Sequence, residues 1–350
     1  MKVLLTGSSG FIGAQIDEQL SKRGDEVVRV DALIPEAHGA HRYADEGLHV
    51  VDVRDAARWG DLLDGVDVVC HQAAMVGAGV TVADLPLYAG HNDLGTAALL
   101  AAMHERGVDA LVLASSMVVY GEGRYACPDH GEQQPPARSR SALDAGDFEN
   151  HCALCDRPLT WELVPEDARL DPRSSYAASK LAQEHYTLAW ARQAGTRAIG
   201  LRYHNVYGPG MPRDTPYSGV AAIFRSSLEA GRAPQVFEDG GQMRDFVHVH
   251  DVARANVLSI DAVRERPAES WTTYNVASGT PVPILRVAAV LAETSGGPAP
   301  EVTGDYRPGD VRHVVASPER ASAELGFTAA IAPDQGIADF ATAPLRASVR

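Results

Sequence analysis

The alternation of apolar and polar residues predicts a chain of short strands and longer helices. Short apolar runs have the length of buried strands, and they cover residues 2–6, 26–30, 48–51, 66–71, 110–114 and 197–201. Helical spacing follows the first run, because Ile12, Ile16 and Leu20 recur on one face, and residues 94–104 and 176–194 also favour helix. Strands that alternate with helices predict an α/β fold with a doubly wound parallel sheet, whose ligands bind beyond the carboxyl ends of the strands.

The second half of the chain has a more mixed pattern. Strands are predicted at residues 235–237, 246–249 and 274–277, and helices within residues 215–231, from about Asp251 and after Pro283. These segments alternate with returns to the sheet. We therefore expect a smaller mixed α/β lobe without a clean boundary to the first half.

Composition narrows the range of partners. The 350 residues carry 31 Lys and Arg against 46 Asp and Glu, a formal net charge of −15. Such an acidic chain binds nucleic acid or an anionic membrane poorly, so we expect neither partner. No apolar run approaches the ~20 residues of a membrane span. The chain enters a predicted strand at once, without the pattern of a signal peptide, and we expect a cytoplasmic protein.

A glycine-rich turn joins the first predicted strand to the first predicted helix. Its sequence is Thr6-Gly7-Ser8-Ser9-Gly10-Phe11-Ile12-Gly13, and the next strand ends at Asp31. In this context the glycines allow a tight turn and bring backbone amides at the helix start close to a pyrophosphate. The Asp31 carboxylate would accept hydrogen bonds from an adenosine ribose and repel a 2′-phosphate. The pattern predicts binding of NAD rather than NADP, and a purely structural glycine turn is the alternative.

Tyr176 and Lys180 are four residues apart in a predicted helix, which Ser174 would cap and Gly195 would end. This spacing puts both side chains on one face, one turn apart. A phenol has a pKa of about 10 and is a poor base at neutral pH, but a neighbouring ammonium lowers that pKa. The pair predicts a general base built from tyrosine. The alternative is a buried tyrosine on which the lysine stem packs.

These features belong to a series of motifs that spans nearly the whole chain. The others are Asp52-Val53, His71-Gln72-Ala73-Ala74, Asn92-x-x-Gly95-Thr96, Ser115-Ser116-x-x-x-Tyr120-Gly121, Arg202-Tyr203-His204-Asn205-Val206-Tyr207-Gly208-Pro209, Arg244-Asp245-Phe246 and Arg307-Pro308-Gly309-Asp310. In this series the chain resembles the extended short-chain dehydrogenase/reductase family of NAD-dependent nucleotide-sugar epimerases and dehydratases. One residue departs from the family pattern, because His204 stands where members usually carry an aromatic such as phenylalanine.

The resemblance implies roles for individual residues. The catalytic residues would be Ser116, Tyr176 and Lys180. The NAD-binding residues would be Gly7, Ser9, Gly10, Phe11, Ile12, Gly13, Asp31, Asp52, Val53, Gln72, Ala73, Ala74, Asn92, Ser115, Tyr176, Lys180, Tyr203, Asn205 and Val206. The nucleotide-sugar-binding residues would be Ser116, Met117, Tyr176, Asn205, Val220, Gln235, Val236, Phe237, Arg244, Arg307 and Asp310. Among them, Asn205, Arg244 and Arg307 would hold the diphosphate, and residues 235–237 would offer backbone to the base.

The resemblance also implies a domain organisation and an assembly. A Rossmann-type NAD-binding domain would cover residues 1–205, with residues 121–170 as an insert and residues of about 242–280 completing its sheet. A nucleotide-sugar-binding lobe would cover residues 206–241 and 281–350. Relatives often form homodimers by packing the helix around residues 92–104 with the tyrosine helix. The side chains compatible with this pairing, and equally with a monomer core, are Leu94, Leu99, Leu100, Leu181, Leu188 and Trp190.

Two residues discriminate among the reactions of the family. Dehydratases carry Asp-Glu after the catalytic serine or threonine, whereas Met117-Val118 stand here and cannot transfer a proton. The resemblance therefore implies 4-epimerisation of a nucleotide-diphospho-sugar through a 4-keto intermediate, with transient hydride transfer to bound NAD. The alternatives are a UDP-hexose or UDP-hexuronate 4-epimerase, a nucleotide-4-ketosugar reductase with an exchangeable cofactor, and a non-catalytic NAD-sensing binder.

The insert carries three of the four cysteines. Cys127-x-x-His130 and Cys152-x-x-Cys155 have the spacing of a zinc ribbon. In a reducing cytoplasm a metal is favoured over a disulfide, so a structural zinc site is one interpretation and a polar loop that holds no metal is the other. The insert, together with Pro216-Tyr217-Ser218-Gly219 and Phe237-Glu238-Asp239-Gly240, resembles the dTDP-L-rhamnose 4-epimerase subgroup. Its members interconvert dTDP-L-rhamnose and dTDP-6-deoxy-L-talose.

Overall fold

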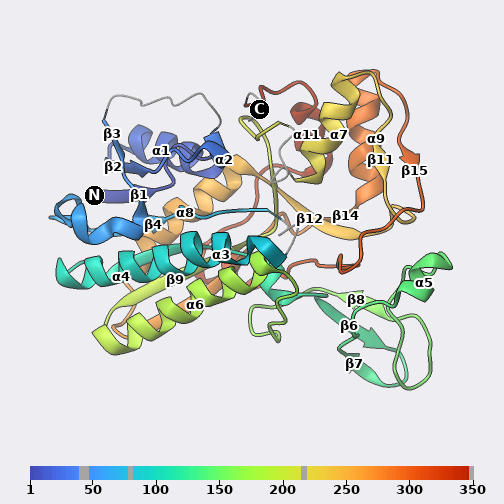
Figure 1. The fold of residues 1–350 in the computed structure, drawn as a ribbon, viewed down its shortest axis with the longest axis horizontal. Coiled ribbons are helices and arrows are strands. Elements are labelled where there is room, and N and C mark those ends of the chain that lie inside the picture. The colour runs from blue at the N-terminus through green and yellow to red at the C-terminus, as the bar shows by residue number, and fades with distance from the viewer. Residues whose placement is uncertain (39–46, 78–81, 214–218, 347–350) are drawn as a thin grey trace.

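Seven parallel strands form the main sheet of the computed structural model, which describes residues 1–38, 47–77, 82–213 and 219–346. Their order is β13-β9-β5-β4-β1-β2-β3 (Figure 1). The strands are β1 (Lys2–Thr6), β2 (Glu26–Asp31), β3 (Leu48–Val50), β4 (Val68–His71), β5 (Ala110–Ser116), β9 (Arg197–Tyr203) and β13 (Ser270–Val276). The chain winds outwards from β1 in both directions, which confirms the predicted doubly wound α/β fold.

Successive strand residues pack on opposite faces of this sheet. In β1, Val3 and Leu5 join the core that α1 (Phe11–Arg23) and α8 (Val249–Arg264) cover. Leu4 joins the core on the other face, with Leu99 of α4 (Gly95–Glu105) and Trp190 of α6 (Ser175–Ala194). Short helices complete the two layers, and they are α10 (Glu319–Leu325), η1 (Val53–Arg58) and η2 (Gly60–Leu63). Burial on both faces explains why the strands read as continuous apolar runs.

Most predicted elements are present with shifted ends. The tyrosine helix α6 follows Ser174, whose hydroxyl accepts a hydrogen bond from the N–H of Ala177, and it ends at Gly195 in the left-handed conformation. A turn of π-helix, η4 (Ala89–Leu94), precedes α4, where the sequence predicted ordinary helix from residue 94. The remaining short helices are α2 (Pro35–His38), η3 (Val82–Asp84), α3 (Leu85–Tyr88) and η5 (Met117–Tyr120).

A smaller mixed lobe accompanies the main sheet, as predicted (Figure 1). Its strands are β10 (Asn205–Tyr207), β12 (Met243–His248) and β14 (Pro281–Pro283) in one sheet, with β11 (Gln235–Val236) and β15 (Glu301–Val302) in another. Its helices are α7 (Val220–Glu229), α9 (Ile284–Ser295) and α11 (Pro333–Phe340). Phe224, Phe246, Leu291 and Phe340 belong to a core of its own.

The insert forms a third, small unit that the sequence did not predict as regular structure. Strand β6 (Arg124–Cys127) pairs antiparallel with β7 (Gly131–Gln133) and β8 (Thr160–Glu162), and α5 (Arg140–Asp144) lies between β7 and β8 in the chain. In Figure 1 this unit projects at the lower right, beyond the main sheet. It contributes no strand to the main sheet.

The chain passes between the main sheet and the smaller lobe more than once. After β10 the chain builds part of the lobe, then returns to supply α8 and β13 to the sheet layer. We keep the division into residues 1–205 and a two-part lobe as a proposal that this path supports. None of the helices described here combines the length and apolar character needed to cross a lipid bilayer.

Candidate active site

The reversal of strand order lies at β1, where the glycine turn meets the loop after β4. Gly7 has a φ of +66°, and a Cβ atom there would lie 2.8 Å from the backbone N of Ala73. A Cβ atom at Gly13 would overlap the carbonyl oxygen of Gly7, so α1 approaches the turn too closely for any side chain. The N-terminus of α1 therefore presents backbone amides at the sheet edge, and this geometry fits a pyrophosphate.

Asp31 ends β2 beside this turn and is buried. Its carboxylate accepts hydrogen bonds from the N–H groups of Ser9 at 3.0 Å and Leu33 at 2.9 Å, and His38 lies 3.2 Å away. Burial by itself would raise the pKa of Asp31, but these partners outweigh it and lower the pKa. A fixed anion at this position fits ribose hydroxyls and disfavours a 2′-phosphate.

The predicted cofactor residues gather along one edge of the sheet. Each group follows or ends a parallel strand, so the groups lie at neighbouring carboxyl ends. They are Gly7 to Gly13 after β1, Asp31 at the end of β2, Asp52 and Val53 after β3, Gln72 to Ala74 after β4, Ser115 in β5, and Tyr203, Asn205 and Val206 across β9 and β10. The structure thus brings together residues that are far apart in the chain.

The Asn92 side chain is fully buried between two other segments of this edge. Its amide exchanges hydrogen bonds with the backbone of Met75 at 2.7 and 3.0 Å and donates to the hydroxyl of Ser179 at 2.8 Å. These bonds tie the loop after β4 to α6. A contribution of Asn92 to cofactor binding would therefore act through the position of that loop.

Ser116 and Tyr176 meet at the same edge. Ser116 is the last residue of β5, and Tyr176 stands in the first turn of α6. The Ser116 hydroxyl favours ionisation of the Tyr176 phenol, and the Ser116 oxygen accepts from the N–H of Val118 at 3.4 Å. Burial raises the pKa of Tyr176 to about 12, although the Ser116 hydroxyl acts to lower it.

Lys180 lies one turn after Tyr176 and is 3% exposed. Its Nζ donates to the carbonyl oxygen of Ala114 at 3.0 Å and lies 6.0 Å from the centroid of the Tyr176 ring. Burial lowers the pKa of Lys180 to about 7, against the opposing effect of Glu184. The sequence predicted an ammonium that lowers the tyrosine pKa. In this structure the tyrosine pKa is instead raised, because the removal of both groups from water disfavours their charged forms.

A buried ion pair that sequence reasoning missed holds α6 against the sheet. Arg202 and Glu184 are 4% and 3% exposed, and the guanidinium donates to the two carboxylate oxygens at 2.9 and 2.8 Å. Ser115 donates to the same carboxylate at 2.5 Å. Glu184 follows Tyr176 and Lys180 at steps of four residues, and this spacing on one helix face is a signal that could have revealed it.

His204 and Asn205 lie between β9 and the smaller lobe. His204 is 4% exposed, and its two ring nitrogens have no partner at hydrogen-bonding geometry within the described ranges. Burial lowers the pKa of His204 to about 3, which the neighbouring Asn275 offsets only in part. The Asn205 Oδ1 atom is likewise buried without a partner there. The departure from the family pattern therefore places a neutral imidazole next to the predicted diphosphate ligand Asn205.

The residues predicted to hold the diphosphate and base lie in the smaller lobe. Arg244 donates to the carbonyl oxygens of Val311 at 2.7 Å and Arg312 at 2.8 Å, so its guanidinium is fixed by backbone. Arg307 is exposed and lies over the ring of Phe237, 5.1 Å from its centroid. Arg307 thus lies against the segment that the sequence predicted for the base, and Arg244 is held by the backbone of residues 311 and 312.

The other predicted substrate residues occupy neighbouring positions of this lobe and edge. Met117 begins η5 directly after Ser116, Val220 begins α7, Gln235 and Val236 form β11, and the N–H of Asp310 donates to the carbonyl of Arg307 at 3.1 Å. The subgroup motif at Pro216-Tyr217-Ser218 lies outside the described residues.

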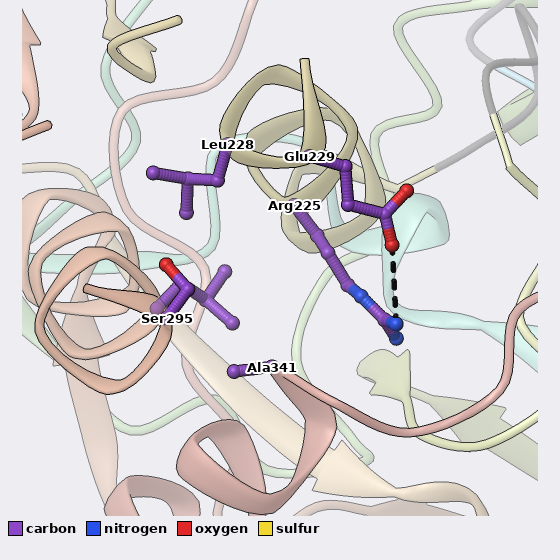
Figure 2. A pocket seen from close by; sticks show the side chains of 6 residues that line it. Arg225, Leu228, Glu229, Ser295 and Ala341 are labelled. Carbon is purple, nitrogen blue, oxygen red and sulfur yellow. Dashed lines mark ion pairs between the residues drawn. The ribbon is translucent and has the colours of Figure 1, made fainter. Parts of the chain in front are cut away.

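A pocket on the smaller lobe is separate from these residues (Figure 2). Its lining residues come from α7, α9 and the segment after α11, and they are Arg225, Leu228, Glu229, Leu291, Ser295 and Ala341. Figure 2 shows the Arg225 and Glu229 side chains directed at each other, 3.2 Å apart. No predicted site residue lines it, so we place the chemistry at the sheet edge instead.

Arg346, near the end of the chain, is a further contact that the sequence did not indicate. Its guanidinium donates to the carbonyl oxygens of Ser9 at 2.5 Å and Gly10 at 3.1 Å. The contact joins positions that are 337 and 336 residues apart, so no local pattern points to it. It ties the C-terminal segment to the glycine turn.

Comparison with known proteins identifies what this chain is similar to. The sequence model of the NAD dependent epimerase/dehydratase family matches residues 3–143 and 160–277. The chain is 35% identical to a dTDP-L-rhamnose 4-epimerase of Burkholderia thailandensis over 353 residues, which covers 97% of this chain and 94% of that protein.

Solved structures agree with the sequence comparison. The fold is similar to that of MoeE5 in complex with UDP-glucuronic acid and NAD, with a TM-score of 0.76, 29% identity, and coverage of 97% of this chain and 98% of that one. It is also similar to Thermus thermophilus UDP-glucose 4-epimerase complexed with NAD, with a TM-score of 0.72, 31% identity, and coverage of 97% and 98%.

We predict that Glu184→Ala lowers the free energy of unfolding by about 3–5 kcal/mol, because it leaves the buried Arg202 charge unpaired. The control is Asp109→Ala, which removes an exposed ion pair with Arg197 of 3.0 Å and should cost less than about 1 kcal/mol. Urea denaturation followed by circular dichroism measures both. Equal losses in the two variants would show that the buried pair does not hold α6.

Proposed function

This chain belongs to the NAD dependent epimerase/dehydratase family, and from that membership we propose that it is an NAD-dependent 4-epimerase of a nucleotide-diphospho-sugar. The favoured substrate pair is dTDP-L-rhamnose and dTDP-6-deoxy-L-talose, because the Burkholderia relative that covers 97% of this chain carries that activity in its name. The observation that carries the proposal is the placement of Ser116 at the end of β5 beside the start of α6, whose Tyr176 and Lys180 lie one turn apart and 6.0 Å from ring centroid to Nζ.

The residues at the sheet edge fit NAD. The glycine turn with the N-terminus of α1 would hold the pyrophosphate, and the Asp31 carboxylate would accept from the adenosine ribose. The chemistry that NAD would supply at this edge is reversible hydride transfer to and from carbon 4 of the sugar. Arg346 would keep the turn closed against the C-terminal segment, through its bonds to Ser9 and Gly10.

We assign to Tyr176 the removal of the proton from the sugar 4-hydroxyl. As phenolate it would remove that proton while the hydroxyl of Ser116 stabilises the same oxygen by hydrogen bonding. A cation beside a phenol favours the phenolate, so Lys180 is assigned this role in its ammonium form, which Glu184 favours. Met117 and Val118 follow Ser116 and carry no group that transfers a proton, which supports epimerisation over 4,6-dehydration.

We assign the binding of the nucleotide diphosphate to the smaller lobe. Arg244 and Arg307 offer planar donors that match phosphate oxygens, and Asn205 adds a side-chain amide. In a chain with a formal net charge of −15, these local cations are what would overcome the general repulsion of a diphosphate. His204 would add a neutral donor or acceptor toward the sugar end.

Turnover without added redox cofactor tests the proposed function. Purified protein incubated with dTDP-L-rhamnose should give a mixture with its 4-epimer, which proton NMR resolves. UDP-glucose and UDP-glucuronic acid serve as comparison substrates and should turn over more slowly. Tyr176→Phe should lose at least about 10²–10⁴-fold in kcat while keeping its NAD content, because the phenol is the base rather than a cofactor anchor. Consumption of NADPH in stoichiometric amounts, or an active Tyr176→Phe variant, would contradict the assignment.

We predict that kcat of the wild type rises with pH from about 6 to about 7, because the ionised fraction of a phenol below its pKa grows with pH. Above about 7 the rise should level off, because Lys180, whose pKa burial lowers to about 7, loses the ammonium form that favours the phenolate. The pKa of Tyr176 is about 12 and the Ser116 hydroxyl acts to lower it. Ser116→Ala should therefore lower kcat by a similar factor across this range, and Ser116→Thr should restore it. A Ser116→Ala variant with the kcat of the wild type would remove Ser116 from the proton transfer.

We also propose a homodimer formed through α4 and α6, which contact each other along one side of the molecule (Figure 1). Leu94 is 57% exposed and Tyr186 of α6 is 46% exposed, whereas Leu99, Leu100 and Trp190 lie in the monomer core. Such exposed apolar side chains on adjoining helices fit a helix-packing interface.

We predict that Leu94→Arg converts the dimer into a monomer, because it places a charge in the proposed interface. Ile223→Arg is the matched control, since Ile223 is 39% exposed but lies on α7 of the smaller lobe. Light scattering after size-exclusion chromatography measures the mass. A monomeric wild type, or dissociation by the control alone, would contradict this interface.

Two further expectations stand as separate proposals that the reaction does not depend on. A cytoplasmic location is supported by four cysteines that form no disulfide, as is usual in a reducing compartment, and cell fractionation checks it. A structural zinc ion in the insert is supported by the convergence of Cys127, His130, Cys152 and Cys155.

A further inference from the structure

The insert has too few buried apolar side chains to form a stable hydrophobic core of its own. Its buried core consists of Tyr125, Cys127, Cys152 and Leu159, with Cys155 and Trp161 packed against it. Half of these residues are cysteines. Small units with so few core residues are usually closed by a metal or by disulfides.

Four ligand atoms converge in this core. The Sγ atoms of Cys127, Cys152 and Cys155 and a ring nitrogen of His130 all lie within 4.8 Å of one another. They come from two separate pairs of residues. Cys127 ends β6 and His130 precedes β7, whereas Cys152 and Cys155 lie in the loop before β8. The site thus joins the two ends of the insert.

The distances among these atoms fit one tetrahedral ion. Zinc bonds of about 2.3 Å to sulfur and about 2.05 Å to nitrogen place tetrahedral ligands about 3.8 Å apart for two sulfurs and about 3.5–3.6 Å apart for sulfur and nitrogen. The Cys127 and Cys155 sulfurs are 3.7 Å apart, and His130 Nδ1 lies 3.4 Å from the Cys127 sulfur and 3.5 Å from the Cys152 sulfur. Three thiolates and one imidazole form a closed set typical of structural zinc.

We propose that Cys127, His130, Cys152 and Cys155 bind one zinc ion, and that the closed insert positions Arg244 for the substrate diphosphate. The second part rests on the proposed function. It concerns the phosphate-side segments, defined as residues 238–244 and 307–314. Side chains of the insert that contact these segments include Glu122, Tyr125, Arg138 and Glu149.

Glu149 is the first connection. Its carboxylate accepts from Arg312 Nε at 3.0 Å and Nη2 at 2.6 Å, and its other oxygen lies 3.0 Å from His313 Nε2. Arg312 is 2% exposed, and its guanidinium also bonds Glu238 and Asp239 at 2.8 Å. Burial makes this cation depend on its partners. Glu149 therefore fixes the segment around residue 312 from the insert side.

Arg138 is the second connection. It donates to the Glu238 carboxylate at 2.8 Å and to the carbonyl oxygen of Asp310 at 2.8 Å. Both Arg138 and Glu238 are buried, at 4% and 3% exposure. One side chain of the insert thus holds both phosphate-side segments together.

The phosphate-side segments in turn orient Arg244. The carbonyl oxygens of Val311 and Arg312 accept from its guanidinium at 2.7 and 2.8 Å, and the N–H of Met243 donates to His313 Nδ1 at 3.0 Å. A continuous path of contacts therefore runs from the zinc ligands Cys127 and Cys152 to Tyr125, which packs with them. The Tyr125 hydroxyl accepts from the N–H of His313 at 3.0 Å, and His313 is bonded to Met243 beside Arg244. Loss of the metal should loosen the insert and weaken diphosphate binding, with less effect on the bond-making residues around Tyr176.

Metal analysis of protein purified without chelators tests the first part. We expect about one zinc per chain in the wild type and none in the Cys152→Ala/Cys155→Ala variant. His151→Gln is the matched control, because His151 adjoins Cys152 but its ring bonds Asp147 and Asp156 instead. It should retain zinc. A zinc-free wild type, whether its thiols are free or oxidised to a disulfide, would overturn the metal site.

The split between KM and kcat tests the second part. Glu149→Gln should retain zinc and raise KM for the nucleotide sugar roughly tenfold or more, with kcat changed much less. The double cysteine variant should show the same split, an unchanged NAD content and a folded circular dichroism spectrum. A zinc-free variant with wild-type KM would overturn the coupling.

A calorimetric titration with dTDP separates this inference from the proposed function. If no nucleotide sugar turns over, the proposed function fails, but weaker dTDP binding by Glu149→Gln and by the zinc-free variant still supports the coupling. Equal dTDP affinity in wild type and both variants overturns it.

Discussion

The polar contacts beneath α6 are the constraint on which the rest of the site depends. The buried face of this helix is not an apolar stripe, because Lys180, Gln183, Glu184 and Thr187 all lie in it. Glu184 is locked to Arg202 of β9, and Lys180 is bonded to a carbonyl of β5. Directional contacts of this kind specify one position of the helix more strictly than apolar packing does. They place the Tyr176 hydroxyl beside Ser116, at the edge where the glycine turn also opens.

The burial of Tyr176 and Lys180 at this edge changes how readily each of them ionises. Burial disfavours the charged forms of both Tyr176 and Lys180, so their pKa values are shifted to about 12 and about 7. The Tyr176 phenol is therefore a weak base on its own at neutral pH. Ser116 acts on the pKa of Tyr176 and Glu184 on that of Lys180, so the proposed roles of the pair depend on these neighbours and on the proposed cofactor.

Local sequence signals predicted much of the fold and of this edge. The glycine turn, Asp31 and the capped tyrosine helix each combine a strand or helix boundary with a residue type that the geometry requires. Such features can therefore be recognised within a short stretch of sequence. The contacts that were missed join distant residues. Arg202 with Glu184, Arg346 with Ser9, and Glu149 with Arg312 are ordinary charged residues in the sequence, and only the tertiary fold brings them together. The insert strands escaped prediction because they are short and pair around cysteines rather than around an apolar pattern.

The central claim is that Tyr176 takes the proton from the sugar oxygen while the hydrogen on carbon 4 never exchanges with water. Deuterium placed on carbon 4 of dTDP-L-rhamnose tests this most directly, with the products examined by mass spectrometry and NMR after the epimers reach equilibrium in ordinary water. The account predicts that the label stays on carbon 4 of both epimers. Replacement of the label by solvent hydrogen would contradict it, because the proton would then have been removed from carbon.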